Sequence, residues 1–140
     1  MTRVAVAYLT RDRVDLSKLS IEPLVQPDKF DTYWIDGSQT EPGLAFFREE
    51  CSNRAYQCRG NITGGADTAV AYALTEMLRR PEKYTHVGIC ENDVRLDVDW
   101  FDRTFDLFQQ GEEEGLHVGS VSARCYVDRV LVQRDGYAVM

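Results

Sequence analysis

The feature that most constrains the fold is the alternation of short apolar runs with amphipathic, helix-like stretches along the 140 residues. Residues 4–9 are almost continuously apolar, and residues 86–90 form a second short run of this kind. Continuous apolar runs are typical of strands covered on both faces, which occur mainly in parallel sheets. Strands that alternate with helices therefore predict an α/β domain with a mostly parallel sheet.

Local patterns place the other elements. Apolar residues recur at i, i+3 and i+4 over residues 70–78, which predicts a helix that Pro81 stops. Pro23 and Pro27 limit any helix in the weakly patterned stretch before them. Further predicted elements are strands at 32–35, 55–58, 117–122 and 127–132, a helix at 44–51, and a helix that follows Asp99 and ends at Gly111.

Charge and composition narrow the possible partners. A net charge of -7 argues against a nucleic-acid partner, which would favour a basic stripe. No stretch approaches the ~20 apolar residues that span a bilayer, and no signal-peptide pattern opens the chain, so a cytoplasmic location is expected. The four cysteines lack C-x-x-C spacing and secretory context, which disfavours a zinc site or a disulfide framework. Cys51 and Cys58 could lie close enough to pair, although nothing in the sequence requires it.

The main candidate site is Glu91-Asn92-Asp93, directly after an apolar strand. Ligands of open α/β sheets bind outside the carboxyl ends of the strands. Carboxylates there suit a hard cation such as Mg²⁺ or Mn²⁺, which is often shared with substrate phosphates. Side chains alternate along an extended chain, so Glu91 and Asp93 are expected on one side. A simple acidic turn is the alternative.

Three further segments carry polar groups that could join this site. Asp36 ends the second predicted strand, where its carboxylate could accept hydrogen bonds from a base or ribose. Thr10 ends the first strand. Residues 63–67 bring Gly65 and Asp67 to the start of a helix, where glycine allows close approach and the helix N-terminus favours anions. Each has a plain alternative as a turn, loop or cap residue.

In this order, the segments resemble family-2-like GT-A glycosyltransferases over about residues 3–110. A short first strand is followed by a second strand that ends in Asp36 and a Gly-Ser turn. A glycine-rich segment then enters a helix of small residues. The next strand delivers a D-x-D type motif, here the Glu-Asn-Asp at 91–93, and residues 98–101 resemble the segment that opens the family's next helix.

The resemblance implies a three-layer α/β/α domain of the nucleotide-diphospho-sugar transferase type. It implies binding of a nucleoside-diphosphate sugar and transfer of the sugar to an acceptor, which could be a saccharide, a lipid or a protein. Asp93, with Glu91, would bind Mn²⁺ or Mg²⁺. The residues implied to contact the donor are Thr10, Asp36, Gly65, Asp67, Glu91 and Asn92.

The sequence departs from the family pattern in two ways. Glu91 replaces the usual first aspartate, which could weaken metal binding. Family members also continue for another domain-sized segment, which supplies the acceptor site and, in inverting members, a general base. Residues 1–140 are therefore expected to be a single nucleotide-sugar-binding domain, truncated before that part and with no catalytic base identified. The apolar run at 137–140 suggests a fragment, or an edge covered by a partner chain such as a second copy.

Three alternatives remain at this stage. A nucleotidyltransferase of similar fold usually carries a glycine-rich basic loop after the first strand, and residues 9–13 contain no glycine. A non-catalytic nucleotide-binding, sugar-binding or interaction module of the same fold is favoured by the short length. A receiver-type signalling domain needs an acidic pair after the first strand, which Thr10-Arg11 does not provide.

Overall fold

The computed structural model describes residues 3–80, 83–116 and 118–121. The chain divides into two compact units, residues 1–95 and residues 96–140. The second unit contains α4 (Trp100–Glu113). The elements of the first unit are β1 (Val4–Thr10), α1 (Val14–Leu24), β2 (Asp31–Asp36), α2 (Glu41–Arg54), β3 (Gln57–Arg59), α3 (Ala66–Leu78) and β4 (His86–Glu91).

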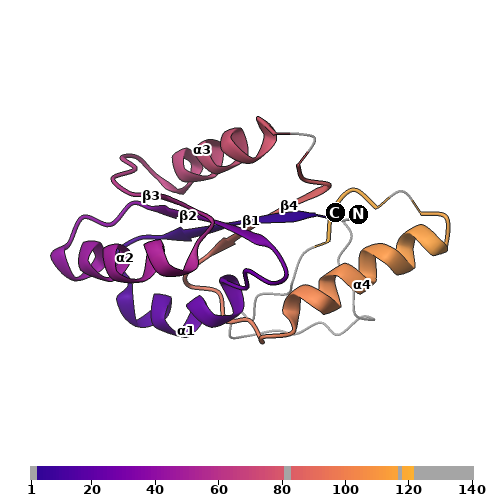
Figure 1. The fold of residues 1–140 in the computed structure, drawn as a ribbon, viewed down its shortest axis with the longest axis horizontal. Coiled ribbons are helices and arrows are strands. Elements are labelled where there is room, and N and C mark those ends of the chain that lie inside the picture. The colour runs from indigo at the N-terminus through magenta and orange to yellow at the C-terminus, as the bar shows by residue number, and fades with distance from the viewer. Residues whose placement is uncertain (1–2, 81–82, 117, 122–140) are drawn as a thin grey trace, which may run out of the picture. The chain divides into compact units, whose positions relative to one another are not determined.

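The sheet of the first unit confirms the predicted parallel α/β architecture. Its strands are ordered β3-β2-β1-β4, and each neighbouring pair is parallel. One face of the sheet is covered by α3, and the other by α1 and α2 (Figure 1). Because all strands run in one direction, their carboxyl ends lie along one edge, and the loops that follow them meet there.

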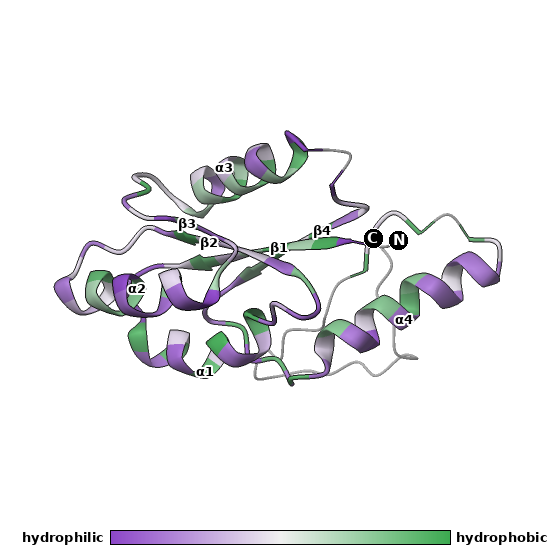
Figure 2. Ribbon diagram, in the orientation of Figure 1, coloured by the Kyte–Doolittle hydropathy of each residue, from purple (hydrophilic) through white to green (hydrophobic). Residues whose placement is uncertain are grey.

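β1 occupies the interior of the sheet, and its continuous apolar run is explained by burial on both faces. All seven of its residues are buried, and the strand is largely hydrophobic along its length (Figure 2). Ala5, Ala7 and Leu9 belong to the core under α3. The alternate residues face α1 and α2, because successive side chains of a strand point to opposite faces.

The weakly patterned stretch in which prolines were expected to limit any helix forms a helix of 11 residues between the first two strands. α1 runs over Val14–Leu24, and Pro23 lies in its last turn, where little of the helix remains to be disrupted. The helical pattern was weak because two of the buried positions of α1 are serines, Ser17 and Ser20, whereas Leu16 and Leu19 are exposed. The Tyr8 hydroxyl lies 2.9 Å from Ser20 Oγ and donates to the Ser17 carbonyl oxygen at 3.2 Å. Burial raises the pKa of Tyr8 above its ordinary value.

On the same face, α2 covers the fully buried Trp34 of β2. The indole ring lies 4.9 Å from the Tyr8 ring and 5.8 Å from the Phe47 ring, measured between centroids. α2 is longer than predicted at both ends. Near its end, a disulfide joins Cys51 to Cys58 of β3, with 6.1 Å between their Cα atoms. This is the pairing that the sequence left open.

The second unit contains the half-buried aromatic face predicted after Asp99, with the Phe101 and Phe105 rings stacked. Two predictions were wrong here. Gly111 lies inside α4 and is buried, because Val118 packs against the surface that a side chain at 111 would occupy. Residues 118–121 do not form a strand, since the chain turns back over the helix end. Residues 117 and 122, the strand predicted at 127–132 and the run at 137–140 lie outside the described residues.

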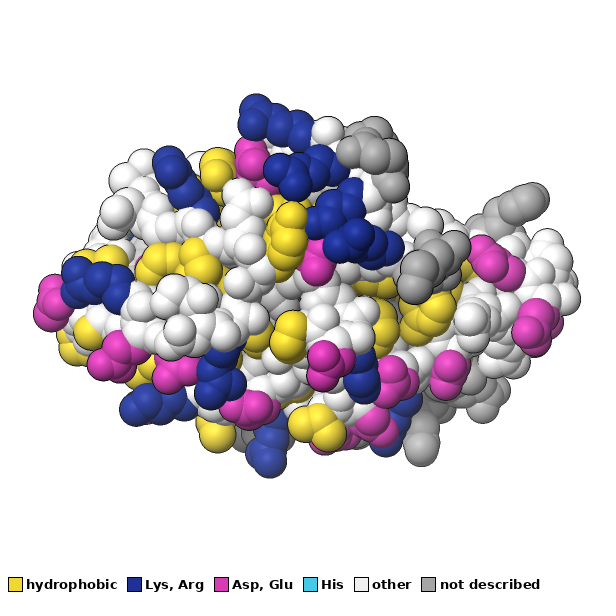
Figure 3. Space-filling model, in the orientation of Figure 1, with side chains coloured by type: hydrophobic (Ala, Val, Ile, Leu, Met, Phe, Trp, Pro, Cys, Tyr) yellow, Lys and Arg dark blue, Asp and Glu magenta, His cyan; other side chains and the backbone are white. Residues whose placement is uncertain are grey.

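The surface agrees with the composition. In the described parts of the chain, no helix is both long and apolar enough to cross a bilayer. On the face drawn in Figure 3, Lys and Arg side chains gather near α3, and further Lys and Arg lie interspersed with Asp and Glu elsewhere on the first unit. This face therefore shows both signs of charge rather than one basic stripe.

Candidate ligand-binding site

A pocket of about 280 Å³ lies at the carboxyl ends of β1 and β4, beside the N-terminus of α3. Its position follows from the strand order. From β1 the chain crosses to β2 on one side, whereas β4 lies on the other side, so the order reverses between β1 and β4. The crevice at such a reversal is where open α/β sheets bind ligands. The strand order thus favours this pocket as a ligand site.

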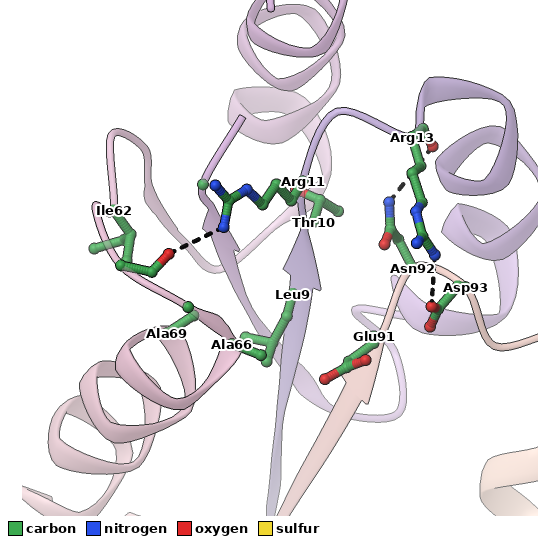
Figure 4. Close-up of a pocket in the computed structure, with 13 residues that line it drawn as sticks. Leu9, Thr10, Arg11, Arg13, Ile62, Ala66, Ala69, Glu91, Asn92 and Asp93 are labelled. Carbon is green, nitrogen blue, oxygen red and sulfur yellow. Dashed lines mark hydrogen bonds and ion pairs between the residues drawn. The ribbon is translucent and has the colours of Figure 1, made fainter. Parts of the chain in front are cut away.

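Arg11 and Arg13, in the loop after β1, are the cationic side chains that line the pocket. Figure 4 shows them reaching to opposite sides. Arg11 Nη1 donates to the Gly64 carbonyl oxygen at 3.0 Å, and Arg13 Nη1 donates to Asp93 Oδ2 at 2.8 Å. Neither residue was predicted from the sequence as part of the site. Their only signal was their place directly after the first strand.

The glycine-rich segment enters α3 along the wall of the pocket. Gly64, Gly65 and Ala66 all line it. Gly64 has a φ of 112°, a conformation that residues with a side chain rarely adopt. Gly65 is the N-cap, and no side-chain hydrogen bond caps the helix there. The first N–H groups of α3 thus have no side-chain cap, and the anion binding that the sequence predicts for this segment stays a prediction.

The tip of β4 brings Glu91, Asn92 and Asp93 to the pocket, but not by the alternation expected from an extended chain. The strand ends at Glu91, and residues 92 and 93 form a turn that carries Asp93 to the same pocket. Asn92 is buried, and its Nδ2 donates to Ser17 Oγ at 2.8 Å. Asn92 thereby fixes the tip of β4 against α1, while both carboxylates stay exposed.

Asp36 lies in a buried hydrogen-bond network beside the pocket. Its side chain is 1% exposed and does not line the pocket. Asp36 accepts from Thr10 Oγ1 at 2.6 Å, from Ser38 Oγ at 2.8 Å and from the Ser38 N–H at 3.1 Å. Thr10 Oγ1 also accepts from Trp34 Nε1 at 2.9 Å. In this structure, the Asp36 carboxylate holds together the ends of β1 and β2.

Asp12 fixes the loop that carries the two arginines. Its Oδ1 accepts 2.8 Å hydrogen bonds from the N–H groups of Gln39 and Thr40 and from the Thr40 hydroxyl. These bonds, that of the Thr40 N–H foremost, lower the pKa of Asp12 below its ordinary value. They tie the loop after β1 to the start of α2, so Arg11 and Arg13 extend from a braced backbone.

Most residues that the sequence singled out come together here. The predicted residues that line the pocket are Thr10, Gly65, Glu91, Asn92 and Asp93. Asp36 lies beside it, and Asp67 is exposed in the first turn of α3 and does not line it. These positions leave the predicted ligand contacts of each residue as predictions.

The donor set of the pocket fits a shared cation better than a closed metal cage. Glu91 and Asp93 offer the oxygen ligands that Mg²⁺ and Mn²⁺ prefer. Among residues 3–80, 83–116 and 118–121, no three acidic, histidine or cysteine side chains cluster as metal ligands. Mg²⁺ commonly takes one or two carboxylates and completes its shell with water and phosphate oxygens. The two exposed carboxylates suit that arrangement.

Comparisons with known proteins add no family to this description. No model of a known protein family matches the chain, and a search of curated proteins finds no significant match. What fold and site define is a small parallel α/β domain with a pocket of mixed charge at the carboxyl edge of its sheet.

Proposed function

We propose that this chain is the donor-binding part of a GT-A-type glycosyltransferase. Its pocket would take the diphosphate of a nucleoside-diphosphate sugar together with Mg²⁺ or Mn²⁺. One observation carries the proposal: two arginines, the N-terminus of α3 and two carboxylates line a single pocket at the reversal of strand order. The order of the sequence segments supports the more specific assignment to glycosyl transfer.

The charges of the pocket account for both parts of this ligand. Guanidinium groups and a helix N-terminus are the usual protein partners of phosphate oxygens. Glu91 and Asp93 would repel the same phosphates, because like charges in one site destabilise each other. A divalent cation between the carboxylates and the phosphates removes this repulsion. A pocket with both signs of charge is therefore better suited to a cation and a diphosphate together.

In glycosyl transfer, the bond that breaks joins the anomeric carbon to a diphosphate oxygen, and negative charge develops on the departing nucleoside diphosphate. When bound, the cation would neutralise part of this charge as a Lewis acid. Arg11 and Arg13 would stabilise the same charge through hydrogen bonds, and Asp93 would hold the cation. The sugar would pass to a saccharide, lipid or protein acceptor.

A calorimetric titration of the whole chain tests the binding step. UDP, GDP and their sugar derivatives would be titrated in Mn²⁺ and in EDTA, with wild type and Asp93→Asn. We expect one nucleotide class to bind at least about tenfold more tightly with Mn²⁺, and the substitution to abolish this gain. Asp28→Asn is the matched control, because Asp28 is exposed in the turn before β2, at the opposite edge of the sheet.

Each result bears on a different part of the proposal. Failure of every nucleotide to bind in either condition overturns it. Equal binding in Mn²⁺ and EDTA, unchanged in Asp93→Asn, overturns the metal assignment. Binding without sugar release, to water or to any acceptor offered, would favour the alternative of a non-catalytic binding module.

A further inference from the structure

We infer that Arg13 and the divalent cation compete for Asp93, so that Arg13 couples the binding of the cation to the binding of the diphosphate. The inference rests on the proposed function. It assigns a role to a residue outside every segment on which the sequence-based hypothesis was built.

The first step is that the Arg13–Asp93 ion pair occupies the carboxylate to which the cation is assigned. Arg13 Nη1 lies 2.8 Å from Asp93 Oδ2. A second cation at the same carboxylate is repelled by the guanidinium, because the two positive charges would lie a few ångströms apart. Mn²⁺ or Mg²⁺ alone should therefore bind this pocket more weakly than it would bind the same carboxylates without Arg13.

The second step is that this ion pair is easily broken. The Arg13 side chain is 61% exposed and the Asp93 side chain 40% exposed. Ion pairs with this much exposure contribute little to stability, since water and salt screen them. Arg13 is also a long side chain on a loop whose backbone is braced by Asp12. The guanidinium can leave Asp93 without disturbing the fold.

The third step is that a diphosphate in the pocket would give the released guanidinium a new partner. Arg13 and Arg11 line the same pocket, as does the glycine-rich start of α3. Arg11 is directed to the Gly64 carbonyl oxygen, on the α3 side, whereas Arg13 extends toward β4 (Figure 4). A diphosphate between them can replace Asp93 as the partner of Arg13. Asp93 is then available to the cation, and each ligand favours the other.

The test measures the two ligands separately on the whole chain. Binding of Mn²⁺ alone would be followed by the loss of the free-ion electron paramagnetic resonance signal. Binding of inorganic pyrophosphate in excess Mg²⁺ would be followed by calorimetry. We expect Arg13→Gln to bind Mn²⁺ about two- to fivefold more tightly, the factor that an exposed ion pair supplies. The same variant should bind pyrophosphate about tenfold more weakly, because a charge-assisted hydrogen bond is lost.

Two variants separate the coupling from general effects of charge. Arg48→Gln removes a comparably exposed arginine, 63% against 61%, from an ion pair with Glu41 that lies outside the pocket lining. Arg48→Gln should change neither the Mn²⁺ affinity nor the pyrophosphate affinity. Arg13→Lys keeps the positive charge, so its Mn²⁺ affinity should stay near that of wild type. Its pyrophosphate affinity should fall only in part.

The possible failures are distinguishable. If wild type binds neither Mn²⁺ nor pyrophosphate, the proposed function fails and the inference with it. If wild type binds both and Arg13→Gln matches it for both, the inference alone is overturned. Weaker pyrophosphate binding without tighter Mn²⁺ binding would also overturn the competition, as would equal changes in Arg48→Gln.

Discussion

Replacing Asp36 with alanine should destabilise the first unit through stranded hydrogen-bond donors rather than through a lost ligand contact. The carboxylate accepts three hydrogen bonds, at 2.6, 2.8 and 3.1 Å, from Thr10 and Ser38. Both donor residues are buried, each at 7% exposure. Water therefore cannot take over these bonds unless it enters the space that the side chain leaves.

The three donors differ in how much their loss costs. The Ser38 backbone N–H cannot turn away, and a stranded buried donor costs about 1–3 kcal/mol. The Thr10 and Ser38 hydroxyls can rotate, so we assign them about 1 kcal/mol together, at the lower end of the same range. Removing the buried carboxylate charge offsets part of this loss of stability. The expected decrease in the free energy of unfolding is therefore about 1–3 kcal/mol. Asp36→Asn, which keeps the volume and one acceptor oxygen, should lose about 1–2 kcal/mol.

Urea unfolding monitored by far-UV circular dichroism and by tryptophan fluorescence measures these values, since Trp34 is buried in the same network. A decrease below about 0.5 kcal/mol for Asp36→Ala, within the range of ordinary surface substitutions, would refute the structural role. If that variant kept full stability but lost nucleotide binding, Asp36 would instead contact the donor, as the sequence predicts. Nucleotide affinities of Asp36 variants should therefore be compared only at temperatures where each is folded.

Two further predictions concern the loops around the pocket. Gly64→Ala should cost about 1–3 kcal/mol in urea unfolding, because φ is 112° and a Cβ would lie 2.5 Å from Thr68 Oγ1. Gly65→Ala, with no atom within 4 Å of its Cβ, should cost less than about 1 kcal/mol, since only the N-cap preference for Gly over Ala is lost. Equal effects of the two would contradict the assigned backbone. Asp12 has a pKa lowered from 3.8, so its stabilising effect is complete above pH 3.8 and is lost as the pH falls through the lowered pKa. Asp12→Asn should thus lose less stability than wild type on acidification, measured by thermal unfolding from pH 6 to pH 2; parallel curves would contradict the prediction.

The fold could be predicted from the sequence where the type of a residue by itself indicates whether that residue is buried or exposed. β1 appears as an apolar run because it is buried on both faces. β4 does not follow this rule, since it is an edge strand of the described sheet and its apolar run includes the exposed Val87 and Ile89. α1 could not be predicted in this way. Its inward positions include serines, and the Tyr8 hydroxyl on β1 and the Asn92 amide after β4 make serines there favourable. That information is tertiary, so no helical periodicity in the segment itself reveals it.

Only part of the pocket lining was predicted, because only some of its residues stand in a recognisable sequence context. Carboxylates and glycines at strand ends have recognisable sequence contexts, and most of those predicted do line the pocket. Arg11 and Arg13 have no such context, because an arginine after a strand is usually a solvated loop residue. Their role depends on the Gly64 carbonyl and the Asp93 carboxylate, which are distant in sequence. Asp36 is the opposite case, because it stands in a recognisable motif but does not line the pocket. Its carboxylate oxygens accept hydrogen bonds from buried neighbours instead.

The balance of charge in the pocket links these residues to its selectivity. Arg11 and Arg13 contribute two formal positive charges, and Glu91 and Asp93 contribute two negative ones, so the lining is formally neutral. A diphosphate alone would leave the pocket negative, in a chain whose net charge is already -7. A divalent cation alone would leave it positive and would have to displace Arg13. Only a divalent cation and a diphosphate bound together keep the pocket formally neutral. Together they also give each arginine and each carboxylate an oppositely charged partner. The pocket should therefore select a cation–diphosphate pair over either ion, whichever nucleoside and sugar the diphosphate carries.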